Sequence, residues 1–205
     1  MGTFDLRFNP RSTDAISGLI KADADEFERL RMRMLGQSED LGASFNDGAS
    51  AFTDGIGWDI RSASAEEIQQ WQDAAGAVEF CACVTRQWGD HVLAFNLERN
   101  ALISEWKEFK AAQEALIPDE YAGQTITATY PEAGFLGLGD GARARELYEG
   151  VLDKLEGLNE RARDNYEALL DNGDDCGDML REGPTPENVR LLTEGGHTNR
   201  VFYTL

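Results

Sequence analysis

Basic residues are scarce in this sequence. Only 19 Lys and Arg stand against 38 Asp and Glu among 205 residues, which gives a formal net charge of −19. Proteins that bind nucleic acids or anionic membrane surfaces need clustered cations to meet the phosphates. We therefore expect no nucleic-acid partner. The acid excess is heaviest after residue 117, where 8 basic and 18 acidic side chains give a net charge of −10.

Long hydrophobic runs are also missing. A membrane-spanning helix needs roughly 18 or more consecutive apolar residues, and no stretch approaches that length, so we expect no membrane insertion. Residues Met1 to Asp5 lack the basic and apolar regions of a general secretory signal peptide. Hydrophobic residues nevertheless make up 41% of the chain, which is too many for intrinsic disorder.

Cysteine and histidine are few. Cys81 and Cys83 are two residues apart and point in different directions on a helix, so only one of them can readily pair with Cys176. The preferred interpretation is three reduced, half-buried thiols. His91 and His197 have no ligand spacing to the cysteines, so we predict no metal site and no cofactor.

What the sequence does contain is helical periodicity. Ser12 or Thr13 is a candidate N-cap for a first helix. Three glycines between Gly36 and Gly48 predict a kink or fraying in its second half. Its apolar stripe repeats every seven residues, as in coiled coils, and comprises Ile20, Phe27, Met34 and Leu41, with Ile16 and Leu30 on the same face.

A second helix is predicted after a turn at residues 55–59. Ser64 and Glu67 have the spacing of a capping box, and Pro118 ends the pattern. About 50 residues of helix would be roughly 75 Å long, a length typical of bundles. The apolar stripe comprises Ile68, Trp71, Ala75, Val78, Ala82, Trp88, Val92, Phe95, Leu102, Trp106, Phe109 and Leu116.

Two short segments, residues 3–8 and 124–130, alternate apolar and polar side chains and predict one small β element. After a Gly-rich stretch, Asp140 is a candidate cap for a third helix. The acidic run Asp171–Asp178 is expected to end or loosen that helix. The stripe of the third helix comprises Leu147, Val151, Leu155, Leu158, Ala162 and Leu169.

A short fourth helix is predicted between Thr185 and Gly195, with Pro186 at its first turn. The tail Asn199–Leu205 is apolar. We expect either that the native chain continues beyond it or that the tail docks on a partner.

Motifs that carry chemistry are weak. The letters Gly137 to Ala142 fit a dinucleotide fingerprint, but a buried strand does not directly precede them. In a calcium-loop reading of Asp171–Glu182, position 6 is Cys176 instead of Gly. His91 is a candidate general base for which the sequence places no nucleophile. We therefore predict a protein that is not an enzyme and has no catalytic residues.

Together these patterns predict a mainly α fold, an elongated antiparallel helical hairpin or a bundle of three long helices with the one β element. The predicted segments are a hairpin at 1–117, a strand and Gly-rich connector at 118–140, and the third and fourth helices with the tail at 141–205. A bundle of two or three helices leaves part of an aromatic stripe uncovered, and such a stripe is typical of a partner surface.

Residues 12–116 resemble the Trp-Xaa-Gly superfamily of type VII secretion substrates, in particular the N-terminal helical domains of actinobacterial effectors. The resemblance lies in the Gly57-Trp58 turn, the helix from Trp71 through Ala74–Ala77 to Trp106, and the missing signal peptide. It implies helical hairpins that pair with themselves or with a small helical partner and that direct toxin-associated cargo for export. The expected location is secreted without a general secretory signal peptide, with a cytoplasmic location as the alternative.

The sequence thus predicts a non-enzymatic helical interaction module. Gly57 and Trp58 are the predicted recognition residues at the hairpin tip, and Trp88, Phe95 and Trp106 the predicted partner contacts. The alternative is an acidic intracellular adaptor, chaperone or DNA-mimic inhibitor that binds a basic protein.

Overall fold

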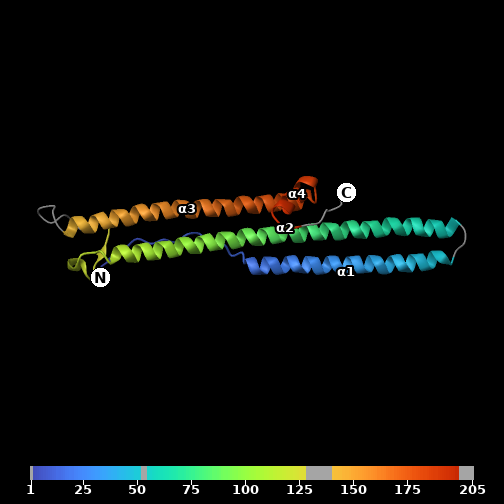
Figure 1. Cartoon of the computed structure of the whole chain (residues 1–205), viewed down its shortest axis with the longest axis horizontal. Helices are drawn as coiled ribbons and strands as arrows, with labels where there is room; N and C mark the ends of the chain where they lie inside the picture. The colour runs from blue at the N-terminus through green and yellow to red at the C-terminus, as the bar shows by residue number, and fades with distance from the viewer. Residues whose placement is uncertain (1, 52–54, 128–139, 199–205) are drawn as a thin grey trace. The chain divides into compact units, whose positions relative to one another are not determined.

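The computed structural model describes residues 2–51, 55–127 and 140–198. The fold is mainly α, as predicted. In chain order the elements are β1 (Thr3–Phe4), α1 (Ser17–Ser50), α2 (Gly55–Glu114), a 3₁₀ turn η1 (Asp119–Tyr121), β2 (Thr125–Ile126), α3 (Asp140–Glu182) and α4 (Pro186–Glu194). Figure 1 shows these elements along the chain.

The chain divides into two compact units that cut across the long helices. Unit 1 joins residues 1–14 to 94–170, and unit 2 joins 15–93 to 171–205. The predicted segments 1–117, 118–140 and 141–205 follow sequence order instead, and they stay a prediction. Both α2 and α3 contribute residues to each of the two units.

Unit 1 has a core built from α2, α3 and the N-terminal segment. Leu102, Val151 and Leu158 are almost fully buried in it. The contacts between α2 and α3 include Glu98 with Arg161 and Glu105 with Lys154. A later residue of α2 thus contacts an earlier residue of α3. That pattern defines two antiparallel helices. The predicted stripe of the third helix is confirmed, since five of its six members are buried and Ala162 is half-buried.

The N-terminal segment lies against the last four turns of α2 in an extended conformation. Lys110 donates to the carbonyls of Phe4 and Leu6, both at 2.8 Å, and Phe8 packs on Trp106. Further along, Arg99 Nε donates to the Arg11 carbonyl at 2.8 Å. The seven residue steps from Phe4 to Arg11 span about 23 Å in an extended chain. The fifteen steps from residue 99 to residue 114 span about the same length in a helix, so the two segments match in length.

The predicted β element is confirmed. Thr3 pairs with Thr125 and Phe4 with Ile126, in parallel. The Thr3 and Asp5 amides donate to the carbonyls of Gln124 and Ile126. The element is shorter than residues 3–8 and 124–130, and residues 128–130 lie outside the described part of the chain. Phe4 and Ile126 both enter the core of unit 1.

Unit 2 contains an antiparallel pair formed by α1 and the first part of α2 (Figure 1). Lys21 pairs with Asp90, Asp25 with Arg86 and Arg31 with Glu79. Small residues form the seam: Ala24, Ser38, Ala49, Gly57, Ser64 and Ala75 are buried. Because the seam is small, the larger side chains of the predicted first-helix stripe lie at its flanks, and Phe27 is 37% exposed.

Two predictions about the ends of α1 are wrong. The helix begins at Ser17 with Ile16 as its N-cap, and no side chain caps it, because residues 10–11 are still held in the extended segment by Arg99. The helix also continues through Gly36, Gly42 and Gly48 to Ser50. A Cβ at Gly42 would lie only 3.2 Å from Ile68 Cδ1, so there the glycine permits close packing.

The predicted start of the second helix is also wrong. Residues 55–59 are the first turn of α2, which is 60 residues long. Ser64 therefore lies inside the helix, and its hydroxyl donates to the Arg61 carbonyl at 2.9 Å instead of capping a first turn. Gly57 and Ser64 continue the buried seam from Ala75 toward the N-terminus of α2. Burial of this face therefore outweighs the low helix propensity of glycine. The C-terminal end falls at Glu114, four residues before Pro118.

The acidic run does not interrupt α3, contrary to prediction. The helix continues to Glu182, because Cys176 and Met179 carry its apolar face forward into a second cluster with Phe80, Val84 and Leu192. A Cβ on Gly173 would lie 3.3 Å from the Trp88 ring, so a small residue is needed there. The predicted fourth helix is confirmed: the Thr185 hydroxyl accepts from the Asn188 amide, and Gly195 is the C-cap.

Candidate interaction surface

The end of the α1–α2 pair that contains the connection between the two helices lies beyond the second cluster. It has no large buried side chain among its described residues. Gly173 meets Trp88 in the antiparallel α2–α3 pair of unit 2, so Glu182 at the end of α3 is level with about residue 79 of α2. The 24 residues from Gly55 to Val78 extend about 36 Å further. In that stretch and in residues 33–50 of α1, the buried residues among those whose burial is described are all small. We call these two stretches the free hairpin.

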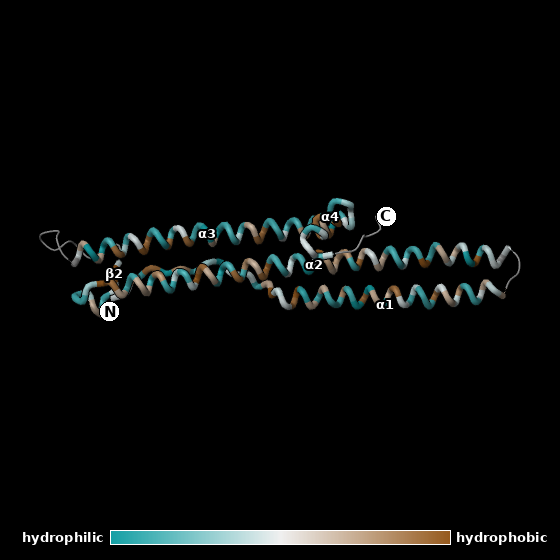
Figure 2. The backbone as a smooth tube through the Cα atoms, viewed as in Figure 1, coloured by the Kyte–Doolittle hydropathy of each residue, from teal (hydrophilic) through white to brown (hydrophobic). Residues whose placement is uncertain are grey.

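Large apolar side chains flank the seam of the free hairpin and are only partly covered. Leu41, Phe45, Ile68 and Trp71 are all half-buried. Leu41 and Trp71, together with Gln37, Asp40 and Ser44, line a hollow of about 370 Å³. Figure 2 shows apolar positions recurring among polar ones along both helices. A two-helix pair buries too little apolar surface to satisfy such side chains, so this surface is suited to a further helix.

The same surface is acidic. The described residues of the free hairpin carry two basic and seven acidic side chains, a net charge of −5. Arg33 and Arg61 are the two cations, and neither lies in an ion pair within the described chain. The charge would weaken pairing with an identical surface and strengthen pairing with a basic one.

The predicted recognition residues lie at the start of α2. Trp58 is 68% exposed in the first turn of the helix, and Gly57 is buried in the seam. The indole therefore projects from the first turn of α2. An exposed Trp is costly in water and is common where proteins bind partners.

The predicted partner contacts lie elsewhere. Phe95 and Trp106 are 3% and 6% exposed and belong to the packing of unit 1. Trp88 is half-buried and packs against the second cluster of unit 2. Three of the aromatic residues therefore serve α2–α3 packing in this structure, and the structure does not bring them together with Trp58. Their role in binding a partner stays a prediction.

A second hollow, of about 330 Å³, lies between α2, α3 and α4 in unit 2. His91, Asp175, Asp178 and Glu182 are in its lining. Burial lowers the pKa of His91, and the nearby His197 lowers it further. Asp178 forms an ion pair with Arg181, and Glu182 accepts a hydrogen bond from the side-chain amide of Asn188. Two of the carboxylates therefore already have partners within the chain. Sequence reasoning missed this hollow, because its lining comes from three helices.

No metal site forms from the acidic run. Asp171, Asp174, Asp175 and Asp178 are helical, and a helix cannot fold them around an ion as a calcium loop does. Among the described residues no group of three or more His, Cys, Asp or Glu side chains is arranged to hold a metal. Residues 137–139 of the dinucleotide-like motif lie outside the described part of the chain.

The cysteines are unpaired. Cys83 and Cys176 are buried and Cys81 is half-buried, all as free thiols. Burial raises the pKa of Cys81 and Cys83, and it raises the pKa of Cys176 to about 11. High pKa values keep thiols protonated and unreactive at neutral pH, which fits the prediction of reduced thiols.

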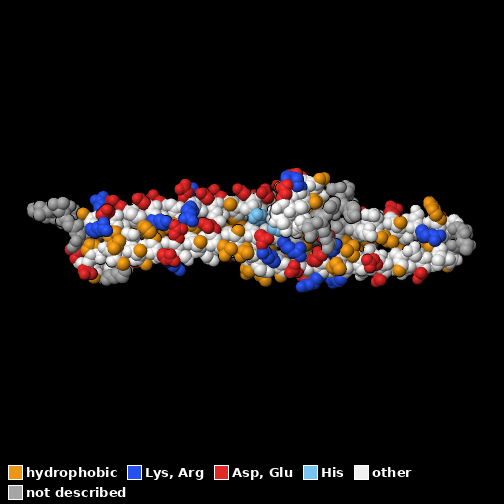
Figure 3. All heavy atoms as spheres, viewed as in Figure 1, with side chains coloured by type: hydrophobic (Ala, Val, Ile, Leu, Met, Phe, Trp, Pro, Cys, Tyr) orange, Lys and Arg blue, Asp and Glu red, His pale blue; other side chains and the backbone are white. Residues whose placement is uncertain are grey.

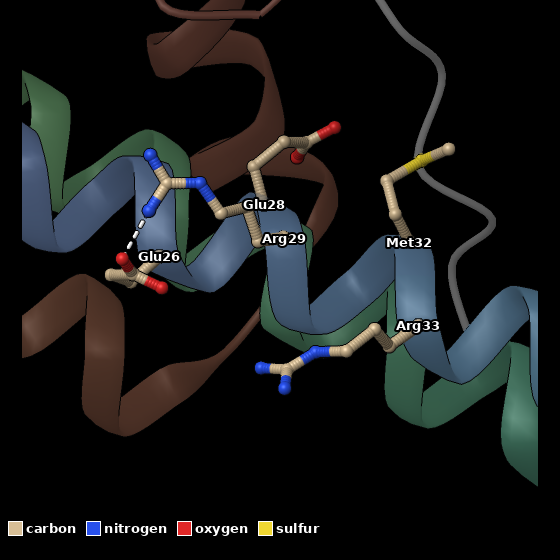
Figure 4. Close-up of a pocket in the computed structure, with 5 residues that line it drawn as sticks. All are labelled: Glu26, Glu28, Arg29, Met32 and Arg33. Carbon is tan, nitrogen blue, oxygen red and sulfur yellow. Dashed lines mark hydrogen bonds and ion pairs between the residues drawn. The ribbon is translucent and has the colours of Figure 1, made fainter.

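A third hollow, of about 600 Å³, lies on α1. Figure 4 shows its lining residues Glu26, Glu28, Arg29, Met32 and Arg33, which all come from that helix. Arg29 is bonded to Glu26 on the neighbouring turn, and Met32 is 59% exposed. A surface made by one helix whose charges partly satisfy one another offers no converging groups for a ligand.

Comparisons with known proteins give no significant match to a family model, a curated protein or a solved structure. In the described part of the chain, no helix is both long and apolar enough to cross a bilayer.

Proposed function

We propose that this chain is a non-enzymatic helical interaction module whose free hairpin packs against a helix of another protein. The observation that carries the proposal is the contrast in the free hairpin between a seam of small buried residues and large apolar side chains that are only half-buried, Leu41, Phe45, Ile68 and Trp71. Each large apolar side chain moved from half-buried to buried would contribute on the order of 1 kcal/mol. A docked helix would supply that burial.

The biological setting that we propose is export through a type VII secretion system, as the targeting domain of a toxin-associated substrate. The support is the resemblance of residues 12–116 to the Trp-Xaa-Gly superfamily together with the helical hairpin of unit 2. In this proposal exposed Trp58 is the group that the secretion machinery recognises, and Gly57 permits the close packing of α1 that fixes it.

Export of single-residue variants tests the secretion proposal. Trp58→Ala should abolish export from an actinobacterial host that expresses the secretion system. Leu97→Ala is the matched control, because Leu97 is also on α2 and is 62% exposed, but it lies in unit 1. Both variants should keep the helical content and the unfolding midpoint of the parent chain. Export of Trp58→Ala at the parent level would rule out recognition through this residue.

A second candidate function is an acidic adaptor, chaperone or DNA-mimic inhibitor of a basic protein. The observation that favours it is the acidic surface: Figure 3 shows Asp and Glu side chains gathered along α3, and the free hairpin has a net charge of −5. Light scattering at low and moderate salt separates the two. Binding to a basic protein that is lost at moderate salt favours the adaptor, whereas salt-resistant association favours hydrophobic helix packing.

A further inference from the structure

We propose that unit 1 contains a binding site for a small organic carboxylate with an apolar body, and that Arg11 receives the carboxylate group. The site is a hollow of about 380 Å³ between residues 9–11 of the N-terminal segment and the stretch 159–170 of α3. Its volume is at the lower end of the range for ligand pockets, about 300 to 1,000 Å³. Nothing in the interaction function proposed above uses this hollow.

Arg11 is the group that points to an anion. Its guanidinium carbon lies 4.9 Å from the centre of the Tyr166 ring, and no carboxylate of the described chain pairs with it. By contrast, Arg161, on the same helix as Tyr166, has two carboxylate partners. A guanidinium stacked on a ring keeps its N–H edge free for two parallel hydrogen bonds to a carboxylate.

The position of Arg11 is fixed before any ligand arrives. Arg99 donates to the carbonyls of Arg11 and Pro10, at 2.8 and 3.4 Å, which holds the backbone against α2. Tyr166 in turn packs edge-on against buried Phe95 with ring centres 6.1 Å apart. Both the cation and its aromatic support are therefore held by α2, and such preorganisation lowers the entropy cost of binding. Arg99 is a positioning residue here.

The remaining lining selects the kind of anion. Pro10, Ala162 and Leu170 provide an apolar wall, and Leu170 is 50% exposed. This wall favours a ligand with an apolar body over a bare inorganic ion. Glu167 and Arg163 also line the hollow and form an ion pair, with Arg163 Nε 4.0 Å from Glu167 Oε1. The lining therefore has a net charge of +1 from Arg11, which matches a carboxylate monoanion better than a phosphate dianion. The chemistry therefore fits a monocarboxylate of about the size of benzoate or 3-phenylpropionate.

Titration of the full chain with benzoate tests the proposal, with calorimetry or chemical-shift changes as the readout. We expect saturable binding in the millimolar range or tighter, and at least tenfold weaker binding of benzamide, which has the same shape without the charge. Arg11→Gln should weaken benzoate binding at least tenfold. Arg7→Gln is the matched control, because Arg7 is an exposed cation of the same segment that does not line the hollow, and it should leave binding unchanged.

Three outcomes would overturn the proposal. They are absence of saturable benzoate binding, equal binding of benzamide, and parent-level binding by Arg11→Gln. Inorganic phosphate is a further probe: if it competes as strongly as benzoate, the hollow recognises charge alone and the assignment to organic carboxylates is wrong. Because Arg11 is exposed, none of these results depends on a variant that fails to fold.

Discussion

Lys110 is the side chain that holds the N-terminal segment on α2, and its replacement gives a local, measurable effect. Its ammonium group donates to the carbonyls of Phe4 and Leu6, both at 2.8 Å, from a position only 22% exposed. Hydrogen bonds with one charged partner contribute about 1.5–3 kcal/mol each. Since both carbonyls regain water when the segment opens, we expect Lys110→Met to lower the opening free energy by about 2 kcal/mol in total. Methionine has a similar length but removes the charge, including the ammonium group that lies 5.9 Å from the centre of the Trp106 ring.

Native-state hydrogen exchange measures that change at the β1–β2 pair. The Thr3 and Asp5 amides are bonded to the carbonyls of Gln124 and Ile126 and exchange only when the segment opens. A loss of about 2 kcal/mol should lower their protection about 30-fold. Lys107→Met, an exposed position one turn away on the same helix, makes the same charge change and should leave protection unchanged. Protection in Lys110→Met within threefold of the parent chain would refute the assignment of the clamp.

Three further predictions concern the cores and the titrating groups. Leu102→Ala should lower the free energy of unfolding in urea by about 3–4 kcal/mol, because Leu102 is fully buried, whereas Leu97→Ala on the exposed face should change it by less than about 0.5 kcal/mol. Burial raises the pKa of Cys176 from 9.0 to about 11, so the unfolded thiol ionises first and the stability that this group contributes should be lost as the pH rises from 9 to 11. Cys176→Ala should reduce that loss in urea titrations at several pH values. The pKa of His91 is lowered, so its imidazole should titrate below 6.5 by NMR, and stability should fall as the pH drops below that value, because the unfolded histidine binds its proton first.

The sequence predicted the helices better than their ends. The third-helix stripe from Leu147 to Leu169 and the cap at Thr185 could be read directly, because each depends on spacing within one element. The start of α2 could not, because the Ser64–Glu67 pattern is equally compatible with a helix interior. What decides between the two is tertiary packing, which buries Gly57 and Ser64 and which the local sequence does not show.

The same limit applies to the candidate sites. Trp58 could be picked out because an isolated Trp beside a glycine is visible in the sequence, and the structure leaves it exposed. Phe95 and Trp106 share a heptad-like stripe, but only the path of the N-terminal segment and α3 shows that they are covered. Arg11 carries no local signal at all. Its contact with the ring of Tyr166, 155 residues later in the sequence, becomes visible only in the folded chain.

The ion pairs between α1 and α2 also limit how the two helices can slide. If α1 slipped by one helical turn in one direction, Lys21 would stand opposite Arg86, and in the other direction Asp25 would stand opposite Asp90. Exposed pairs such as these add little to stability, typically less than about 1 kcal/mol each, but either slip would exchange attraction for repulsion. A seam of small residues has few interlocking side chains that would prevent sliding. The register of α1 against α2 is therefore set largely by the ion pairs.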